Sequence, residues 1–354
     1  MAVSRERSGP PPVSPEVHPD RTVTFRIYAP DSDHISVWGE WGGPDSPMEP
    51  DYAGVWSAMV GPLDPGLYGY HLNVDGLAML DPGNSWVKPA RAPNTSILDV
   101  PGAQPLIHGF QDVPHGDLRI IGYHSRSLRR SRRMRVYTPP GYEGGSDRYP
   151  VLCLLHGRGD NDATWSELGR AHLIADNLIA SGDAVPLVIV MTDGHAYIEE
   201  EWDGNARRLN IEALRRDLLE DVLPLVDSRY RTLTDQPNRA IAGLSMGGGQ
   251  AVTIGLNHLD LFSHVAGFSS YMGPPREAVA PALDSPDDVN RALTLLWLAI
   301  GEEDFLLDDA KEFHAALEAA GIEHQYQLTS GDHSWPVWRQ YLAELLPVLF
   351  KEDS

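Results

Sequence analysis

One serine in the sequence, Ser245, lies in a setting that can turn its hydroxyl group into a nucleophile. It is the centre of Gly243-Leu244-Ser245-Met246-Gly247, a Gly-x-Ser-x-Gly pentapeptide. The apolar run Ala240–Gly243 precedes it, and a helical pattern over Met246–Leu259 follows. A strand, tight turn and helix in this order strain the serine backbone, demand small residues two positions away and expose the hydroxyl. We therefore interpret Ser245 as a candidate nucleophile rather than an ordinary turn serine.

A serine hydroxyl needs a general base, and motifs of this type place the acid and then the histidine after the serine. Two of the later histidines fall inside predicted helices and two flank or enter predicted strands, which is typical of surface or packing residues. His333 instead lies in the loop sequence SGDHSWPVW, between a strand-like segment and the last predicted helix. We predict His333 as the base; the alternatives are His258, His264, His314 and His324.

The acid of such a site should follow an intervening strand. The segment LLWLAIGEED supplies an apolar strand that runs into the acidic turn Gly301–Asp304. Asp304 lies at the tip of that turn, where a carboxylate can orient an imidazole and stabilise its cation. We predict Asp304 as the acid; the competing carboxylates are Glu303, Asp308 and Asp332.

An oxyanion that forms on the attacked carbonyl needs two backbone N–H donors. The residue after the nucleophile, Met246, supplies one. The second is expected from the loop His156-Gly157-Arg158-Gly159, where small glycines allow a close approach and Arg158 N–H is the candidate donor. His156 is interpreted as a structural residue that is hydrogen-bonded beneath this loop.

The sequence that must position these groups divides into four regions. Residues 1–20 are Pro-rich and lack the apolar segment of a signal peptide, so we expect a disordered tail and a cytoplasmic location. Residues 21–102 contain short alternating segments such as Thr22–Tyr28, separated by Gly, Pro and Asp clusters, which predict an all-β sandwich. Residues 103–116 are interpreted as a linker and residues 117–354 as the catalytic domain.

The catalytic region alternates between apolar strand segments and amphipathic helix segments. The predicted strands are Val151–Leu155, Leu187–Met191, Ala240–Gly243, His264–Phe268 and Leu295–Ile300. The predicted helices are Thr164–Ser181, Ile211–Ser228, Met246–Leu259, Asp308–Ala320 and Trp335–Leu346. This alternation predicts a doubly wound, mostly parallel sheet whose functional groups lie at the carboxyl ends of the strands.

Charge and cysteine content exclude several partner classes. The chain has 28 Lys and Arg against 50 Asp and Glu, a net charge of −22, so no nucleic-acid or anionic-membrane partner is expected. A single cysteine and the lack of closely spaced Cys and His predict neither a disulfide nor a metal site. The basic segment Arg126–Arg135 is expected to be an exposed strand pair, with an anion site as the alternative.

The sequence resembles the putative-esterase branch of the α/β-hydrolases. The resemblance rests on LLHGRGDNDATW, DLLEDVLPLVDSRYR, RAIAGLSMGGGQAVTIGLNHLDLF, GEEDF and SGDHSWPVWR, and it extends from about Gln111 to the C-terminus. The branch includes enterochelin esterases, feruloyl and acetyl-xylan esterases, S-formylglutathione hydrolase and mycolyltransferases. It implies an α/β-hydrolase fold, and its Ser, Asp and His fall on Ser245, Asp304 and His333.

The front segments FRIYAP, ISVWGEWGG and GVWSAMVGPLDPGLYGYHLNVDG resemble early-set immunoglobulin-like domains related to glycogen-binding modules. Such a domain precedes the hydrolase in enterochelin esterases and several feruloyl esterases. Its tryptophans are expected either to stack on sugars or to fill the sandwich; they are Trp38, Trp41, Trp56 and Trp86. In the catalytic region Trp165, Trp202 and Trp335 are the candidate substrate contacts, with core packing as the alternative.

These observations predict a serine carboxylic-ester hydrolase of the feruloyl, acetyl or enterochelin esterase type, which acts through an acyl-enzyme without a cofactor. The expected partner is a small-molecule or glycan-linked ester. Two alternatives remain at this point: an acyltransferase of the mycolyltransferase type, and a glycan-binding protein with a non-catalytic hydrolase fold. The sequence does not indicate an oligomeric state.

Overall fold

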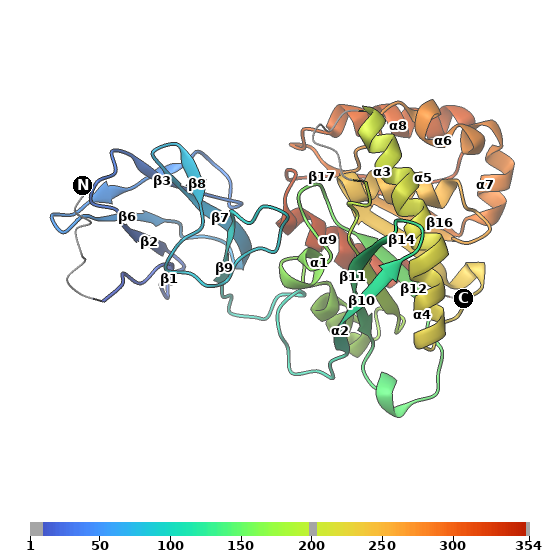
Figure 1. Cartoon of the computed structure of the whole chain (residues 1–354), viewed down its shortest axis with the longest axis horizontal. Helices are drawn as coiled ribbons and strands as arrows, with labels where there is room; N and C mark the ends of the chain where they lie inside the picture. The colour runs from blue at the N-terminus through green and yellow to red at the C-terminus, as the bar shows by residue number, and fades with distance from the viewer. Residues whose placement is uncertain (1–9, 198–203, 352–354) are drawn as a thin grey trace. The chain divides into compact units, whose positions relative to one another are not determined.

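The computed structural model describes residues 10–197 and 204–351 (Figure 1). The described chain divides into two compact units. The front unit comprises Met1–Lys88 and Ala92–Leu106, and the second unit comprises Pro89–Arg91 and Ile107–Ser354. The short segment Pro89–Arg91 belongs to the second unit, although the residues on either side of it belong to the front unit. The predicted bounds of the domains stay a prediction.

The front unit is built from two antiparallel sheets around one core. The strand order of the first sheet is β1 (Glu16–Val17), β2 (Val23–Tyr28), β6 (Val55–Val60) and β5 (Glu49–Pro50). The second contains β4 (Ser46–Pro47), β3 (Ile35–Gly39), β7 (Gly66–Val74) and β8 (Leu77–Met79), and β9 (Ser96–Val100) also pairs with β7. Phe25 and Tyr70 meet between the sheets with ring centroids 4.9 Å apart. The all-β prediction is confirmed, whereas the immunoglobulin-like label stays a prediction.

The structure corrects the predicted tail over residues 1–20. Its described part includes strand β1, which pairs with β2. Ser14 is buried and donates a 2.6 Å hydrogen bond to Asp81, a buried carboxylate that also accepts from Tyr70 at 2.8 Å. A buried carboxylate requires such donors, so these long-range contacts order a segment whose composition indicated disorder.

The predicted linker over residues 103–116 is also largely docked on the second unit. Asn177 donates to the carbonyl groups of Ile107 and Gly109 at 2.7 and 3.0 Å. His115 contacts the Asp176 carboxylate at 2.9 Å. The prediction missed these contacts because they join residues that are 61 to 70 positions apart in the sequence.

The second unit is organised around an eight-stranded, mostly parallel sheet. Its order is β10-β11-β13-β12-β14-β15-β16-β17, and only the pairings of β10 (Asp117–Ser125) and β11 (Arg130–Thr138) are antiparallel. The parallel strands are β12 (Val151–Leu155), β13 (Val188–Thr192), β14 (Arg239–Leu244), β15 (His264–Phe268), β16 (Leu295–Gly301) and β17 (Gln325–Thr329). The central strands are buried along their whole length, because helices cover both faces of the sheet. The five predicted strands are confirmed.

Helices cover both faces of this sheet (Figure 1). On one face α5 (Met246–Leu256) packs on the central strands beside α3 (Gly204–Arg216), α6 (Pro275–Asp284) and α8 (Leu307–Ala320). On the other, α9 (Trp335–Leu345) packs on β15 and β16 and against α2 (Ala171–Ser181). The remaining helical segments are α1 (Thr164–Glu167), α4 (Leu223–Arg229), α7 (Pro286–Ala292), a π-helical turn (Asp217–Val222) and short turns at Tyr142–Gly144, Gln236–Asn238 and Leu346–Val348.

The single helix predicted over Thr164–Ser181 is wrong. The structure splits it into α1 and α2, because Arg170 adopts a left-handed backbone conformation with φ of 56°. Close packing holds the break, since a side chain at Gly169 would collide with Trp165 and Trp335. None of the described helices is long and apolar enough to span a bilayer.

Buried histidines should make the fold sensitive to mild acid. Burial lowers the pKa of both His195 and His264 to about 4. Between about pH 6.5 and 4 the unfolded chain therefore binds protons that the folded chain excludes, so stability falls as the pH falls, by roughly 1–2 kcal/mol per histidine at pH 5. Unfolding measured from pH 7 to 5 should show this loss, and His264→Gln should reduce the slope. An unchanged slope in that variant would contradict the assignment.

Candidate active site

Ser245 lies in the turn that joins β14 to α5. Its backbone has φ of 52° and ψ of −117°, a strained conformation for a residue with a side chain. The flanking glycines explain how the turn fits: a side chain at Gly243 would collide with the Gly247 backbone, and one at Gly247 with the carbonyl groups of Leu155 and His156. The backbone N–H of Ser245 donates to the Phe268 carbonyl at 2.8 Å. The local sequence thus builds a tight strand–turn–helix connection of the kind that the pentapeptide predicted, with Ser245 half-buried in the turn.

The structure brings His333 and Asp304 to Ser245. His333 Nε2 lies 3.0 Å from Ser245 Oγ, and His333 Nδ1 lies 2.8 and 3.0 Å from the two Asp304 oxygens. Ser245 follows β14, Asp304 follows β16, and His333 precedes α9. All three lie at the edge where the parallel strands end. The competing carboxylates Glu303, Asp308 and Asp332 are exposed, whereas Asp304 is buried.

The environment of Asp304 keeps this carboxyl group ionised. Burial raises its pKa, but the hydrogen bond and the charge interaction with His333 outweigh burial, so its pKa lies below the usual value. The backbone N–H of Leu306 also donates to Asp304 at 2.9 Å. An ionised acceptor fixes the Nδ1 proton of His333 and leaves Nε2 free to accept the serine proton.

Ser269 and Trp338 support this arrangement, and the sequence did not single out their roles. Trp338 Nε1 donates to Ser269 Oγ at 3.1 Å, and a hydrogen bond from Ser269 is one of the interactions that lower the pKa of Asp304. The Trp338 ring also meets the His333 ring edge-on, with centroids 4.9 Å apart. The position of Ser269 could have indicated its role, because it directly follows β15 at the edge of the sheet where the site was expected.

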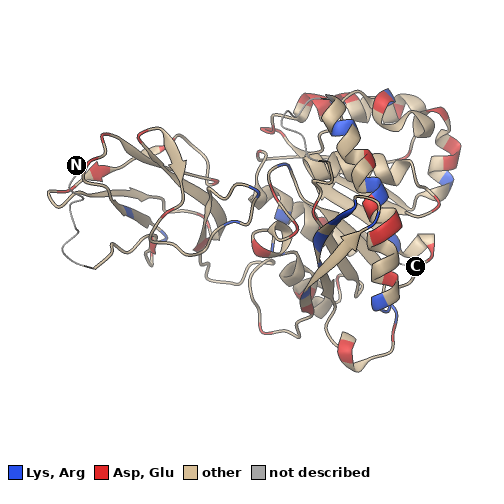
Figure 2. Cartoon of the chain, in the orientation of Figure 1, with Lys and Arg blue, Asp and Glu red and all other residues tan. Residues whose placement is uncertain are grey.

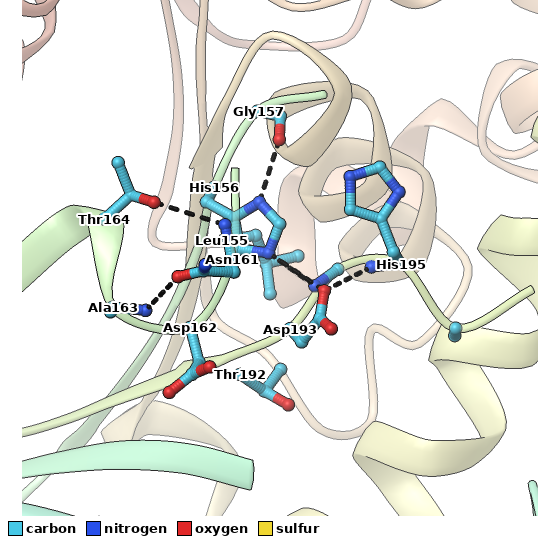
Figure 3. Close-up of polar contacts among 12 residues, drawn as sticks. Leu155, His156, Gly157, Asn161, Asp162, Ala163, Thr164, Thr192, Asp193 and His195 are labelled. Atoms are coloured by element: carbon cyan, nitrogen blue, oxygen red, sulfur yellow. Dashed lines mark hydrogen bonds and ion pairs between the residues drawn. The ribbon is translucent and has the colours of Figure 1, made fainter. Parts of the chain in front are cut away.

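The loop after β12 carries Arg158, the candidate second oxyanion donor, and runs close to Ser245. A side chain at Gly157 would lie 3.5 Å from Ser245 Cβ, so this backbone passes directly beside the serine. His156 anchors the loop from below: its Nδ1 lies 2.8 Å from the Gly157 carbonyl, and its Nε2 accepts from Gly194 N–H at 2.8 Å (Figure 3). Met246 begins α5, where the first N–H groups of a helix have no acceptor within the helix. Arg158 and Met246 thus remain the candidate donors.

The predicted substrate contacts of the tryptophans need correction. Trp165 and Trp335 are each only 1% exposed and pack edge-on against each other with centroids 5.1 Å apart. Trp165 Nε1 donates to the Leu155 carbonyl at 2.9 Å. Both rings therefore belong to the core between the sheet and its helices. Trp202 lies outside the described residues. A different aromatic residue, Phe305, is 75% exposed and lies 4.4 Å from the His333 ring.

The part of the chain that the structure describes contains no group of three or more His, Cys, Asp or Glu residues arranged to hold a metal ion. Two of the other candidate histidines have partners elsewhere: His314 and His324 contact each other at 2.7 Å beside Tyr326.

Comparison with known proteins finds relatives that are described as esterases. A protein of Xylanibacter ruminicola described as endo-1,4-beta-xylanase/feruloyl esterase is 31% identical over 346 residues, which cover 95% of this chain and 46% of that protein. An acetyl esterase of Caldicellulosiruptor saccharolyticus is 24% identical over 265 residues, which cover 63% of this chain and 94% of that protein. The chain spans about half the length of some curated relatives, including 55% of an uncharacterized protein of Corynebacterium glutamicum.

Solved structures show the same fold. A ferulic acid esterase has a TM-score of 0.59 and 29% identity and covers 67% of this chain and 98% of its own. The enterobactin esterase of Shigella flexneri has a TM-score of 0.69 and 20% identity and covers 93% of both chains. The predicted α/β-hydrolase fold is confirmed. A family model described as "Putative esterase" matches residues 125–349, and the chain therefore belongs to that esterase family.

Proposed function

We propose that this protein hydrolyses carboxylic esters, with Ser245 as nucleophile, His333 as general base and Asp304 as the orienting acid. The observation that carries the proposal is the continuous chain of contacts from Ser245 Oγ through the His333 ring to Asp304. Membership of the esterase family supports the same reaction class.

The geometry accounts for both halves of the reaction. Ser245 Oγ bonds to the ester carbonyl carbon while its proton passes to His333 Nε2, and the same proton then leaves with the alcohol. Water next attacks the acyl-enzyme, gives its proton to His333 and releases the acid with Ser245 restored. The Met246 and Arg158 N–H groups hold the oxyanion in both steps, which require no other reactant.

The substrate class that we favour is an aromatic or acetyl ester attached to a polysaccharide. Its support is the likeness to proteins described as feruloyl and acetyl esterases, including a ferulic acid esterase structure at 29% identity. Phe305 offers an exposed aromatic surface beside His333, on which a planar acyl group can stack.

A panel of esters tests this proposal with the full chain. We expect measurable turnover of p-nitrophenyl acetate, and a higher kcat/KM for methyl ferulate or acetylated xylan than for a macrolactone. Released acid should be quantified together with alcohol, so that transfer to a second alcohol is distinguished from hydrolysis. A chain that folds but turns over none of these esters would contradict the proposal.

Ser269→Ala should weaken the hydrogen bonding that holds the Asp304 carboxylate in place. The change removes a hydrogen bond to Asp304 and leaves the buried Trp338 Nε1 without its acceptor, which costs about 1–3 kcal/mol of stability. We expect kcat to fall by roughly tenfold with little change in KM, because the imidazole is held less firmly. Trp338→Phe is the companion variant, since it removes the Nε1 donor whose hydrogen bond Ser269 Oγ accepts and retains a ring beside His333. A kcat equal to wild type in both variants would contradict this positioning role.

A further inference from the structure

A second feature of this unit is a cleft of about 480 Å³, and its lining includes Asn161 and Asp162, which directly follow the loop Gly157–Asp160. It lies where β11, the end of β13 and the segment Pro89–Arg91 meet, all within the second unit. The residues that line it are Arg91, Arg130, Ser131, Arg132, Arg133, Asn161, Asp162, Asp193 and His195.

The segment that carries Arg91 is firmly attached to this unit. The backbone N–H of Arg91 donates to the Gly159 carbonyl at 2.8 Å, and Thr164 Oγ1 donates to the Pro89 carbonyl at 2.8 Å. These bonds use backbone atoms of the segment, so the Arg91 guanidinium group remains available to the cleft.

Two of the four arginines in the lining are neutralised by carboxylates. Arg133 makes a paired contact with Asp162 at about 2.9 Å, and buried Arg132 lies 3.0 Å from Asp217. These ion pairs balance the charges of Arg132 and Arg133 on the basic strand β11. Within the described residues, the charges of the other two arginines, Arg91 and Arg130, are not balanced in this way.

Arg130 and Arg91 are not paired with any carboxylate of the described residues. Arg130 donates to the carbonyl groups of His195 and Ala196, and the Arg91 guanidinium has no hydrogen-bond partner in the described chain. The Asp193 carboxylate is turned toward its own loop and accepts from His195 N–H at 2.9 Å (Figure 3). The cleft therefore keeps a positive surplus.

The positive charge in the cleft is electrostatically unfavourable, and it is confined to this part of an otherwise acidic protein. Burial and the charge of Arg132 lower the pKa of Arg130, and Arg91 contributes to the same repulsion. The chain as a whole has a net charge of −22, and Figure 2 shows blue arginines gathered on the β10–β11 hairpin of a largely acidic molecule. Guanidinium groups are the preferred partners of carboxylates and phosphates because their donors match two oxygens at once. An oxyanion in the cleft would relieve the repulsion.

The loop links this cleft to the proposed reaction centre. Gly159 N–H donates to His195 Nε2 at 3.2 Å on the cleft side, while Gly157 borders Ser245 on the other. We propose that the cleft is a substrate subsite that binds a carboxylate or another oxyanion carried by the ester. This inference deepens the proposed ester hydrolysis and rests on it for the identity of the ligand as a substrate.

The first test measures binding without catalysis. Inorganic phosphate is titrated calorimetrically into the full chain, into Arg91→Gln and into Arg129→Gln, at low salt because exposed charges are screened above about 0.1 M. Arg129 is the matched control: it is exposed on the same hairpin, carries the same charge and lies outside the cleft. We expect Arg91→Gln to weaken binding at least fivefold and Arg129→Gln to leave it unchanged. No binding to the wild type, or equal binding to all three, overturns the anion site.

The second test asks whether the anion belongs to the substrate. Mono-p-nitrophenyl esters of glutaric, adipic and suberic acid are compared with their methyl-capped neutral counterparts. The ratio of kcat/KM for charged over neutral ester should fall about tenfold in Arg91→Gln, recover in Arg91→Lys and stay at the wild-type value in Arg129→Gln. Phosphate binding with an unchanged ratio overturns the substrate subsite. Phosphate binding without hydrolysis of any ester instead removes the proposed function and leaves the anion site standing.

Discussion

Ser245→Ala is expected to lower kcat on p-nitrophenyl acetate by roughly 10³-fold or more, while the fold stays intact. The change removes only the Oγ atom that lies 3.0 Å from His333 Nε2, and alanine retains a Cβ at a position whose backbone is already strained. Steady-state kinetics with active-site titration of the wild type measures the effect.

The control for this result is the folded state of the variant. Circular dichroism and the unfolding midpoint should match the wild type, because Ser245 Oγ contacts the His333 ring and no core residue depends on it. A folded variant that keeps activity close to wild type would contradict the assignment of the nucleophile.

Asp304→Asn is expected to lower kcat by about 10²–10⁴-fold with a nearly unchanged KM. An amide in this position can hold the imidazole in the wrong tautomer and cannot stabilise the imidazolium that forms in the transition state. The substitution also places a neutral group where two histidine contacts of 2.8 and 3.0 Å now end on an ionised carboxylate.

Glu303→Gln is the matched control for Asp304→Asn. Glu303 adjoins Asp304 in the same acidic turn and loses the same charge on substitution, but its side chain is exposed. We expect less than a twofold change in kcat. A large loss in Glu303→Gln combined with a small loss in Asp304→Asn would show that the acid is misplaced.

The central sheet could be predicted from the sequence because its strands are short, apolar and regularly separated by helix patterns. The apolar runs at Val151–Leu155 and Leu295–Ile300 are buried strands, as expected from sheets covered on both faces. The break at Arg170 escaped prediction, because periodicity continues across it and only the packing of Gly169 against two tryptophans requires it. The order of the described residues 10–20 escaped prediction for a related reason, since a partner as distant in the sequence as Asp81 holds Ser14.

The sequence could predict those residues of the candidate site that stand next to a recognisable strand or helix. Ser245, Asp304 and His333 each occupy a loop that follows or precedes a recognisable element, so chain order alone could nominate them. The support that Ser269 and Trp338 provide is not local, because 69 positions separate the two residues in the sequence. Trp165 and Trp335 were assigned to substrate because tryptophans near strand ends suit both a pocket and a core, and only their burial distinguishes the two.

Covalent labelling of the full chain shows directly whether Ser245 is the nucleophile. A fluorophosphonate reagent transfers its phosphonyl group to an activated serine oxygen as fluoride leaves, and peptide mass spectrometry then locates the adduct. We expect a single adduct on Ser245 that abolishes p-nitrophenyl acetate hydrolysis and is absent from Ser245→Ala. An unmodified Ser245 in a preparation that hydrolyses esters, or an adduct on another serine that accompanies the loss of activity, would contradict the assignment of Ser245 as the nucleophile.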